Sequence, residues 1–316
     1  MFKRLASLSS YSIASQVIIL LNSLYLLTLL NVESFGLYGI YVALWAIFTP
    51  IFTGTFELKI LTESDKKVKK LTNFVASYIL ISFFIFLSFS LLIFNQTGNI
   101  IFIFTSIGVF ITAISSVFKM HDMRRKIMIN FARGMLINSI IFCIASNYLV
   151  IQGFNEKYIL IVSHIIGQLS IFVFYIFAIK IYHSFIVLSE AIKLFFKHKE
   201  NLLFVLPSTL TGQVTQTYTL GINFIFGLEL GGIYTIIQRI IIAPFIAIGT
   251  WITDGIRNKV AENIRNHADN ANIVSNFIKW LTISGILLLI IYQITIPSVL
   301  GLFIDSMIIS KYVSEI

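Results

Sequence analysis

Long apolar stretches separated by short polar segments dominate the hydropathy pattern of the chain. Nine of these stretches are long enough to cross about 30 Å of hydrocarbon as a helix that rises 1.5 Å per residue. They lie at about 11–30, 37–56, 72–94, 100–118, 132–150, 158–179, 202–226, 232–252 and 277–296. A tenth segment, 297–310, is short and contains Asp305, so its crossing stays open. The pattern predicts an all-α polytopic membrane protein with nine or ten transmembrane helices.

The composition agrees with a chain that lies mostly in a membrane. Hydrophobic residues make up 57% and charged residues 12% of the sequence, and this charged fraction is roughly half that of a soluble domain. A water-soluble fold is therefore excluded. Cys143 is the single cysteine and lies in an apolar run. Disulfides and thiolate metal sites are not available, and we expect neither a metal nor a cofactor.

Basic residues gather in every second loop. Most of the 23 Lys and Arg residues fall in one alternate set of loops, which starts with Lys3 and Arg4 and includes clusters at 66–70 and 124–126. This asymmetry predicts a cytoplasmic N-terminus. Because topology explains the net charge of +9, we do not expect nucleic acid as a partner. The first apolar stretch runs into the second without a cleavage site, so no signal peptide is expected.

The loops on the opposite face are short. They lie near 31–35, 95–99, 151–157 and 227–231 and contain only a few residues each. The helices should therefore pair there as tight hairpins, without room for an outer catalytic domain. This argues against an enzyme that works on the outer surface.

An internal repeat relates the first helices to later ones. Matching features recur 194 to 197 residues apart. They are Ser15-Gln16 with Gly212-Gln213, Gly36-Leu37-Tyr38 with Gly232-Ile233-Tyr234, Pro50 with Pro244, and Glu57 with Asp254. Six helices separate the two starts, so both halves enter the membrane in the same direction and are related by an axis along the membrane normal. Two such lobes are typical of transporters, with a substrate path between them.

The repeat also divides the chain. It predicts an N-terminal lobe at 1–185, a cytoplasmic linker at 186–201 and a C-terminal lobe at 202–316. Two full copies would need more residues than the 316 present. We therefore expect the second lobe to be incomplete, with at least two helices fewer than the first.

These features resemble the O-antigen flippases, in the polysaccharide branch of the multidrug/oligosaccharidyl-lipid/polysaccharide exporter superfamily. The resemblance covers most of the chain. It rests on the Ser/Gln-rich first helix, the Phe35-Gly36-Leu37-Tyr38 turn, and the block from Pro207 through Gly232-Ile233-Tyr234 to Pro244. It implies two six-helix lobes that move an undecaprenyl-pyrophosphate-linked oligosaccharide across the bacterial inner membrane. This chain departs from that pattern by ending early.

Arg239 is the sharpest candidate for substrate binding. It lies within the span 232–252, about 12 Å from the predicted outer end, where a charge is costly without a cavity or a partner. Its planar fork suits phosphate oxygens, and the resemblance implies a cationic central cavity to which Arg239 would belong. The alternative is a structural arginine that pairs with a carbonyl or a neighbouring helix.

A polar stripe follows one face of the seventh span. Steps of four and three residues align its members, which are Thr209, Gln213, Gln216, Thr219 and Asn223. The first span repeats the stripe more weakly with Gln16 and Asn22. Such faces are suited to line a hydrated path for a sugar. Hydrogen bonding between helices explains them about equally well.

Three ionisable residues have weaker functional interpretations. Glu57 and Asp254 end the second and eighth spans at the cytoplasmic face, and pairing with Lys or Arg would make them an inner gate. An ordinary interfacial carboxylate is the simpler reading. His164 has Gln168 one turn away, which allows a proton relay, although a lone histidine is more often a packed residue.

The leading hypothesis is a flippase, not an enzyme, that exports an O-antigen or capsule repeat unit by alternating access. Its partners would be the lipid-linked oligosaccharide, membrane lipids and other polysaccharide-assembly proteins. Alternatives are an inactive flippase remnant, a polymerase or acyltransferase of polysaccharide assembly, and a multidrug or sodium-coupled exporter. The last would be expected to carry carboxylates in mid-span, and the sequence has none there.

Overall fold

The computed structural model describes residues 2–125, 129–178, 188–239 and 243–266, together with eight single positions between 275 and 293. By its contacts the chain divides into two units, Met1–Arg265 and Asn266–Ile316. All the helices with described bounds belong to the first unit. The predicted ninth span, 277–296, and the tenth segment, 297–310, lie outside the continuous described ranges.

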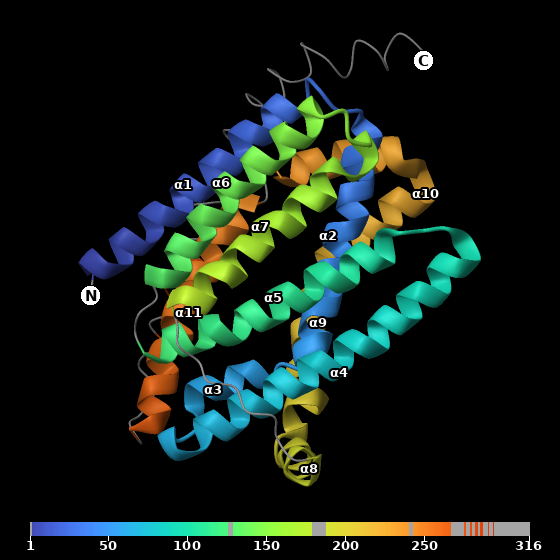
Figure 1. The fold of residues 1–316 in the computed structure, drawn as a ribbon. Helices are drawn as coiled ribbons and strands as arrows, with labels where there is room; N and C mark the ends of the chain where they lie inside the picture. The colour runs from blue at the N-terminus through green and yellow to red at the C-terminus, as the bar shows by residue number, and fades with distance from the viewer. Residues whose placement is uncertain are drawn as a thin grey trace. The chain divides into compact units, whose positions relative to one another are not determined.

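The described residues of the first unit form helices joined by short turns (Figure 1). The first seven elements are α1 (Phe2–Leu26), α2 (Val32–Thr53), the 3₁₀ turn η1 (Phe56–Leu58), α3 (Lys59–Thr62), α4 (Asp65–Thr97), α5 (Ile101–Arg124) and α6 (Ile129–Ile151). Then follow α7 (Glu156–Ala178), α8 (Leu188–Lys197), the π-helix η2 (Asn201–Val205), α9 (Leu206–Thr211), α10 (Val214–Ile237) and α11 (Ala243–Arg265).

Glycines end two of the long helices. Gly54 follows α2 with φ of 56°, and Gly98 follows α4 with φ of 70°. Both adopt the left-handed conformation that glycine tolerates best at a helix C-terminus. At the start of α4, Ser64 is extended and Asp65 occupies the first turn, where a carboxylate is stabilised by the helix dipole.

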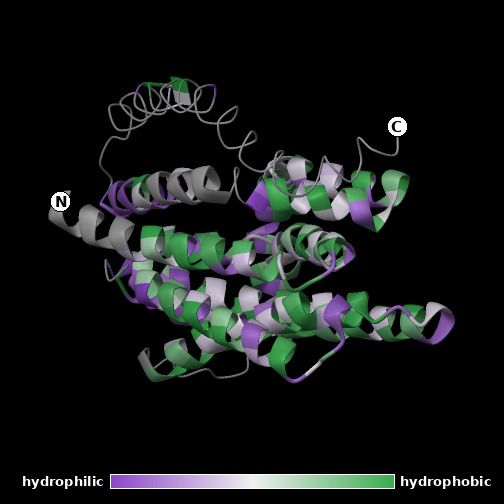
Figure 2. Cartoon of the chain, turned by 90° about the horizontal axis from the view of Figure 1, so that it is seen from above, coloured by the Kyte–Doolittle hydropathy of each residue, from purple (hydrophilic) through white to green (hydrophobic). Residues whose placement is uncertain are grey.

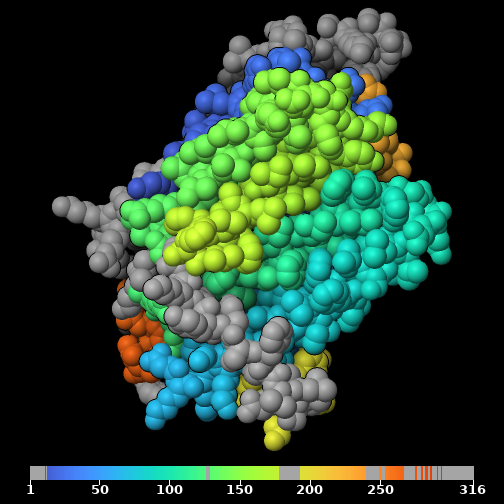
Figure 3. Space-filling view, viewed as in Figure 1, coloured from blue at the N-terminus to red at the C-terminus, as the bar shows by residue number. Residues whose placement is uncertain are grey.

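The first seven helices form a bundle around α2. Helix α2 packs against α4, α5 and α7, while α1 lies along α6 and α6 lies along α7. The space-filling view shows α6, α7 and the α4–α5 hairpin as neighbouring strips of one face (Figure 3). Two main apolar clusters fill the bundle, one around Phe56 and Val75 and one around Tyr41 and Leu160.

Apolar residues also face outward at helical spacing. On α1 the exposed residues are Ile13, Val17, Leu21 and Tyr25, and on α6 they are Ile140, Ile144, Tyr148 and Ile151. Hydrophobic residues run along much of the described helices (Figure 2). Helices with an apolar outer face need an apolar solvent, so this pattern is that of a multi-pass membrane protein.

Six of the described helices are long and apolar enough to cross a membrane. They are α2, α4, α5, α6, α7 up to Phe177, and α10, which reaches this length only when its two parts on either side of Gly227 are counted together. Predicted spans 72–94, 132–150 and 158–179 lie on α4, α6 and α7, with shifted ends. The apolar part of α1, Ile13–Leu26, is shorter than any of these six helices. The all-helical membrane architecture is thus confirmed, whereas the full number of spans stays a prediction.

The region predicted as spans 202–226 and 232–252 is more irregular than expected. A π-helix and the short α9 precede α10, with a turn at Gly212 and Gln213. Inside α10, Gly227 has non-helical angles of φ 86° and ψ 171°. The chain reverses direction at this break. The evidence is a hydrogen bond across it, in which Thr219 Oγ1 donates to Gln238 Oε1 at 3.2 Å. The predicted outer loop 227–231 is therefore reduced to a break at one glycine.

Candidate functional site

Two glycines lie where the backbones of α2 and α10 approach each other closely. A methyl group on Gly36 would overlap the carbonyl oxygen of Leu228, and one on Gly232 would overlap the carbonyl oxygen of Val32. Small residues permit such close approach between membrane helices. We call this pair of contacts the outer contact, because the predicted topology places it near the outer face.

The outer contact is reciprocal. The repeat equates Gly36 with Gly232, and the same separation of 196 residues equates Val32 with Leu228. Each glycine therefore meets the carbonyl equivalent to the one that its counterpart meets. Reciprocal contacts are typical of an interface around a two-fold axis.

Arg239 lies below the outer contact, two residues after α10. Its guanidinium carbon is 5.0 Å from the ring centre of Tyr38 on α2 and 5.0 Å from that of Phe142 on α6. By residue count, the two rings are about 9–14 Å from the predicted outer ends of their helices. The Nη1 nitrogen of Arg239 is buried and has no hydrogen-bond partner among the residues that the structure describes.

Polar and aromatic side chains from α2 and α7 surround His164. Tyr41 Oη lies 3.0 Å from His164 Nδ1, and Gln168 Nε2 lies 3.4 Å from His164 Nε2. The Trp45 ring meets the imidazole edge-to-face at 5.2 Å. The Tyr38 ring connects this group to Arg239, since its centre is 6.1 Å from the imidazole centre and 5.0 Å from the Arg239 guanidinium carbon. His164, the candidate proton-relay residue, thus lies near Arg239, the candidate substrate-binding residue.

Asp254 forms ion pairs at the predicted cytoplasmic side. Its carboxylate lies 2.5 Å from Lys119 Nζ on α5 and 3.4 Å from Arg257 Nη1 on its own helix, α11. The side chains of Asp254 and Lys119 are 6% and 15% exposed, so the pair is largely removed from water. We call these three residues the inner ion-pair cluster. It joins α5 of the predicted first lobe to α11 of the second.

Glu57 lies beside the inner ion-pair cluster but is not one of its three members. The carboxyl is buried in η1, and its Oε2 atom has no hydrogen-bond partner in the described part of the chain. Burial raises the pKa of Glu57, and a hydrogen bond from Thr53 and the charges of Arg257 and Lys119 only partly oppose this. The protonated form is therefore favoured more in the folded chain than in water.

Replacing Glu57 by glutamine is expected to stabilise the protein at neutral pH. The raised pKa means that the stability that Glu57 provides is present below the ordinary glutamate pKa of about 4.3 and is lost as the pH rises through the folded value. Thermal unfolding of purified protein should show a higher midpoint for Glu57→Gln near pH 7.5, and the difference should shrink toward pH 4. A lower midpoint for the variant at neutral pH would contradict this.

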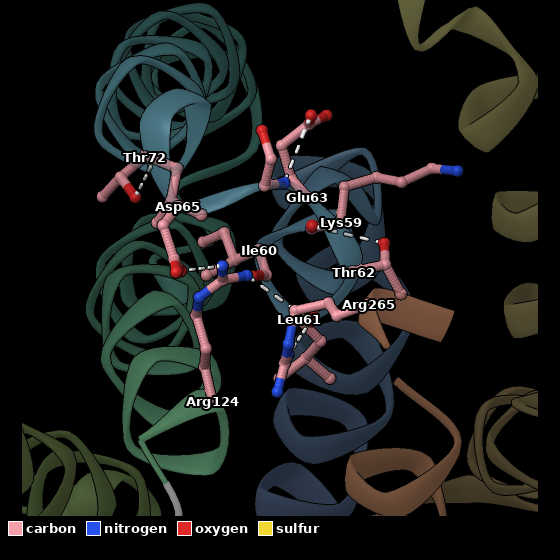
Figure 4. A network of polar contacts seen from close by, with 11 residues as sticks. Lys59, Ile60, Leu61, Thr62, Glu63, Asp65, Thr72, Arg124 and Arg265 are labelled. Atoms are coloured by element: carbon pink, nitrogen blue, oxygen red, sulfur yellow. Dashed lines mark hydrogen bonds and ion pairs between the residues drawn. The ribbon is translucent and has the colours of Figure 1, made fainter. Parts of the chain in front are cut away.

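A second set of contacts ties the same side together (Figure 4). Arg124 of α5 donates to the Ile60 carbonyl at 2.6 Å and pairs with Asp65 at 2.5 Å. Arg265 of α11 donates to the Leu61 carbonyl. Both arginines thus reach the C-terminal carbonyls of α3, where a cation is stabilised by the helix dipole. Helices α5 and α11 are held to one short helix.

The polar stripe predicted on the seventh span is divided by the turn at Gly212 and Gln213. Thr219 and Asn223 are buried, and Thr209, Gln213 and Gln216 are half-buried. Neighbouring positions such as Val214 and Tyr218 are exposed. The upper part of the stripe packs between helices, because Asn223 lies against Gly231 and Gly36.

Asn22 of the first helix faces α6. Asn22 Nδ2 donates to Ser146 Oγ at 3.0 Å, and Asn147 Nδ2 donates to Asn22 Oδ1 at 2.9 Å. Gln16 is half-buried. The bonds of Asn22 are those of a helix–helix contact, which is the simpler of its two interpretations.

Comparison of the chain with protein-family models, curated proteins and solved structures gives no match. The resemblance to polysaccharide flippases therefore stays a prediction from the residues that carry it. The described ranges contain no group of three or more His, Cys, Asp or Glu side chains placed to hold a metal.

Several residues of the site were not singled out from the sequence. Lys119 belongs to the loops whose basic residues we attribute to membrane topology. Its place directly after an apolar run is a signal for an interfacial ion pair. Tyr41 and Trp45 carried no signal, since aromatic residues recur throughout the chain. Asn201, which donates to the Thr55 carbonyl at 3.0 Å, joins the start of η2 to the turn between α2 and η1.

Proposed function

We propose that this protein is a flippase that moves an anionic, lipid-linked oligosaccharide across the bacterial inner membrane by alternating access. The proposed cargo is an O-antigen or capsule repeat unit on undecaprenyl pyrophosphate. Its charged part is the pyrophosphate, so a membrane path for it needs a cation that is partly shielded from water and able to bind phosphate oxygens.

The setting of Arg239 is the observation that carries the proposal. Aromatic rings flank its guanidinium at 5.0 Å, and the buried Nη1 has no partner among the described residues. An arginine at this depth is costly unless something receives its charge. A phosphate group would supply oxygens to the free N–H and would turn a costly cation into a charge-assisted hydrogen bond.

The contacts on either side of Arg239 fit alternating access. The outer contact holds α2 to α10 on one side, and the inner ion-pair cluster holds α5 to α11 on the other. Both join helices of the first predicted lobe to helices of the second. Opening one set while keeping the other would expose Arg239 to one face of the membrane at a time.

The charge balance of the site favours an anionic cargo over a cationic drug. Around Arg239 the ionisable side chains of the described chain are His164, Cys143 and Tyr38, and none of them is a carboxylate. A cation exporter would be expected to place a carboxylate there. Glu57 and Asp254 lie instead at the predicted cytoplasmic ends.

Replacing Arg239 by alanine is expected to abolish export. The test is complementation of a strain that lacks its O-antigen flippase, with surface polysaccharide as the readout. Arg239→Lys should restore only part of the polysaccharide, because an ammonium keeps the charge but loses the planar fork. The wild-type chain should restore it fully.

The exposed Arg125 provides a matched control. Arg125→Ala removes the same side chain from a loop and should leave export at the wild-type level. Export by Arg239→Ala at the wild-type level would contradict the phosphate role. Failure of the wild-type chain, when it is present in the membrane, would contradict the flippase proposal itself.

A further inference from the structure

His164 has two neighbours that suit either of its protonation states. Neutral imidazole has one N–H donor and one acceptor nitrogen, whereas imidazolium has two donors. The Tyr41 hydroxyl, 3.0 Å from Nδ1, is able to donate or accept. The Gln168 amide faces Nε2 at 3.4 Å through its nitrogen, and an amide flip would present its oxygen instead.

Arg239 is the charge that opposes a proton on His164. The Tyr38 ring contacts both groups, since its centre is 5.0 Å from the Arg239 guanidinium and 6.1 Å from the imidazole centre. Among the described residues, Arg239 is the charged side chain that shares the Tyr38 ring with His164. The other titratable groups around the ring are Tyr38 and Tyr41, which are neutral at ordinary pH.

We propose that His164 is a proton-binding site linked to anion binding at Arg239, so that the protein takes up a proton when an anion arrives. The proposal rests on the anion-binding role of Arg239 in the proposed function. An anion on Arg239 cancels the charge that repels the proton, and a proton on His164 in turn strengthens anion binding. By linkage, both effects have the same free energy. The proton comes from water and returns to water when the anion leaves.

Trp45 provides the readout, because imidazolium quenches indole fluorescence more strongly than imidazole does. Its ring meets His164 edge-to-face at 5.2 Å. The chain has three tryptophans, so Trp251→Phe and Trp280→Phe leave Trp45 alone. The purified protein is titrated with acid, with and without inorganic pyrophosphate. Sulfate serves as a second anion, because its charge is constant from neutral to mildly acidic pH.

Acid should quench Trp45, and either anion should move the quenching midpoint up by about one pH unit, a typical effect of neutralising a nearby charge. The affinity for sulfate should rise about tenfold over the same interval. Arg239→Gln should raise the midpoint without any anion and remove the response to anions. His164→Gln should remove the acid quenching.

Two results would overturn the proposal. One is sulfate binding at Arg239 with an unchanged quenching midpoint, which would leave the anion site intact and refute only its link to His164. The other is acid quenching that persists in His164→Gln. If neither anion binds the wild-type protein, the role of Arg239 in the proposed function fails as well.

Discussion

Gly36→Ala is expected to separate α2 from α10 and to destabilise the protein by about 1–3 kcal/mol, the usual cost of added volume in a packed contact. The added methyl meets the backbone carbonyl of Leu228, which cannot rotate away as a side chain does. Gly232→Ala should have a similar effect, because it meets the equivalent carbonyl of Val32. Thermal or denaturant unfolding in detergent measures the loss.

Gly221→Ala is the matched control for the outer contact. Gly221 lies in α10, but a methyl group there meets nothing within 4 Å. Alanine is the better helix former by about 1 kcal/mol, so this variant should be as stable as the wild type or more so. Equal stability of the Gly36 and Gly221 variants would show that the close approach of α2 and α10 does not hold the structure together.

Asp254→Asn is expected to have the largest effect among substitutions in the inner ion-pair cluster. It leaves Lys119, which is 15% exposed, without the carboxylate 2.5 Å away. Removing one partner of a buried pair costs about 3–5 kcal/mol. Lys119→Met should cost less, since Asp254 keeps Arg257 at 3.4 Å. Unfolding of the two purified variants measures this order.

Two further variants make this comparison decisive. The double variant Lys119→Met with Asp254→Asn should be more stable than Asp254→Asn alone, because it leaves no isolated cation on α5. Glu63→Gln removes a pair in which Lys197 is 48% exposed, and it should cost at most about 1 kcal/mol. An Asp254→Asn variant no less stable than Glu63→Gln would contradict a structural role for the cluster.

Hydropathy predicted the helices well but not their ends. The span 72–94 lies inside α4, which begins at Asp65 and ends at Thr97. The additional turns carry charged and polar residues, which continue a helix outside the apolar layer without adding to its hydropathy. Residue patterns detect the part of a helix that meets lipid, whereas caps such as Ser64 and Gly98 set its limits.

The region around Gly227 shows why glycines are ambiguous in sequence. The predicted loop 227–231 ended at Gly231, and the predicted span 232–252 began at Gly232. The structure places both in helical backbone, where Gly232 allows contact with Val32 and Gly231 lies against Asn223. Only the helix that packs on a glycine decides between these roles.

The candidate site was predictable in its charges but not in its partners. The position of Arg239 within an apolar span indicated a special role, whereas pairing with Lys or Arg was the less favoured of the two interpretations of Asp254. The rings beside Arg239 come from α2 and α6, and Lys119 comes from α5. Contacts between such distant segments depend on tertiary packing, which residue spacing within one helix does not reveal.

Translocation in liposomes tests the central claim most directly. The purified protein is reconstituted with undecaprenyl-pyrophosphate-linked oligosaccharide, and the glycan that crosses to the opposite leaflet is measured over time. We expect crossing well above that of protein-free liposomes with the wild type, and crossing at the protein-free level with Arg239→Ala. A wild-type protein that moves no more glycan than empty liposomes, or an alanine variant that moves as much as the wild type, would contradict the proposed mechanism.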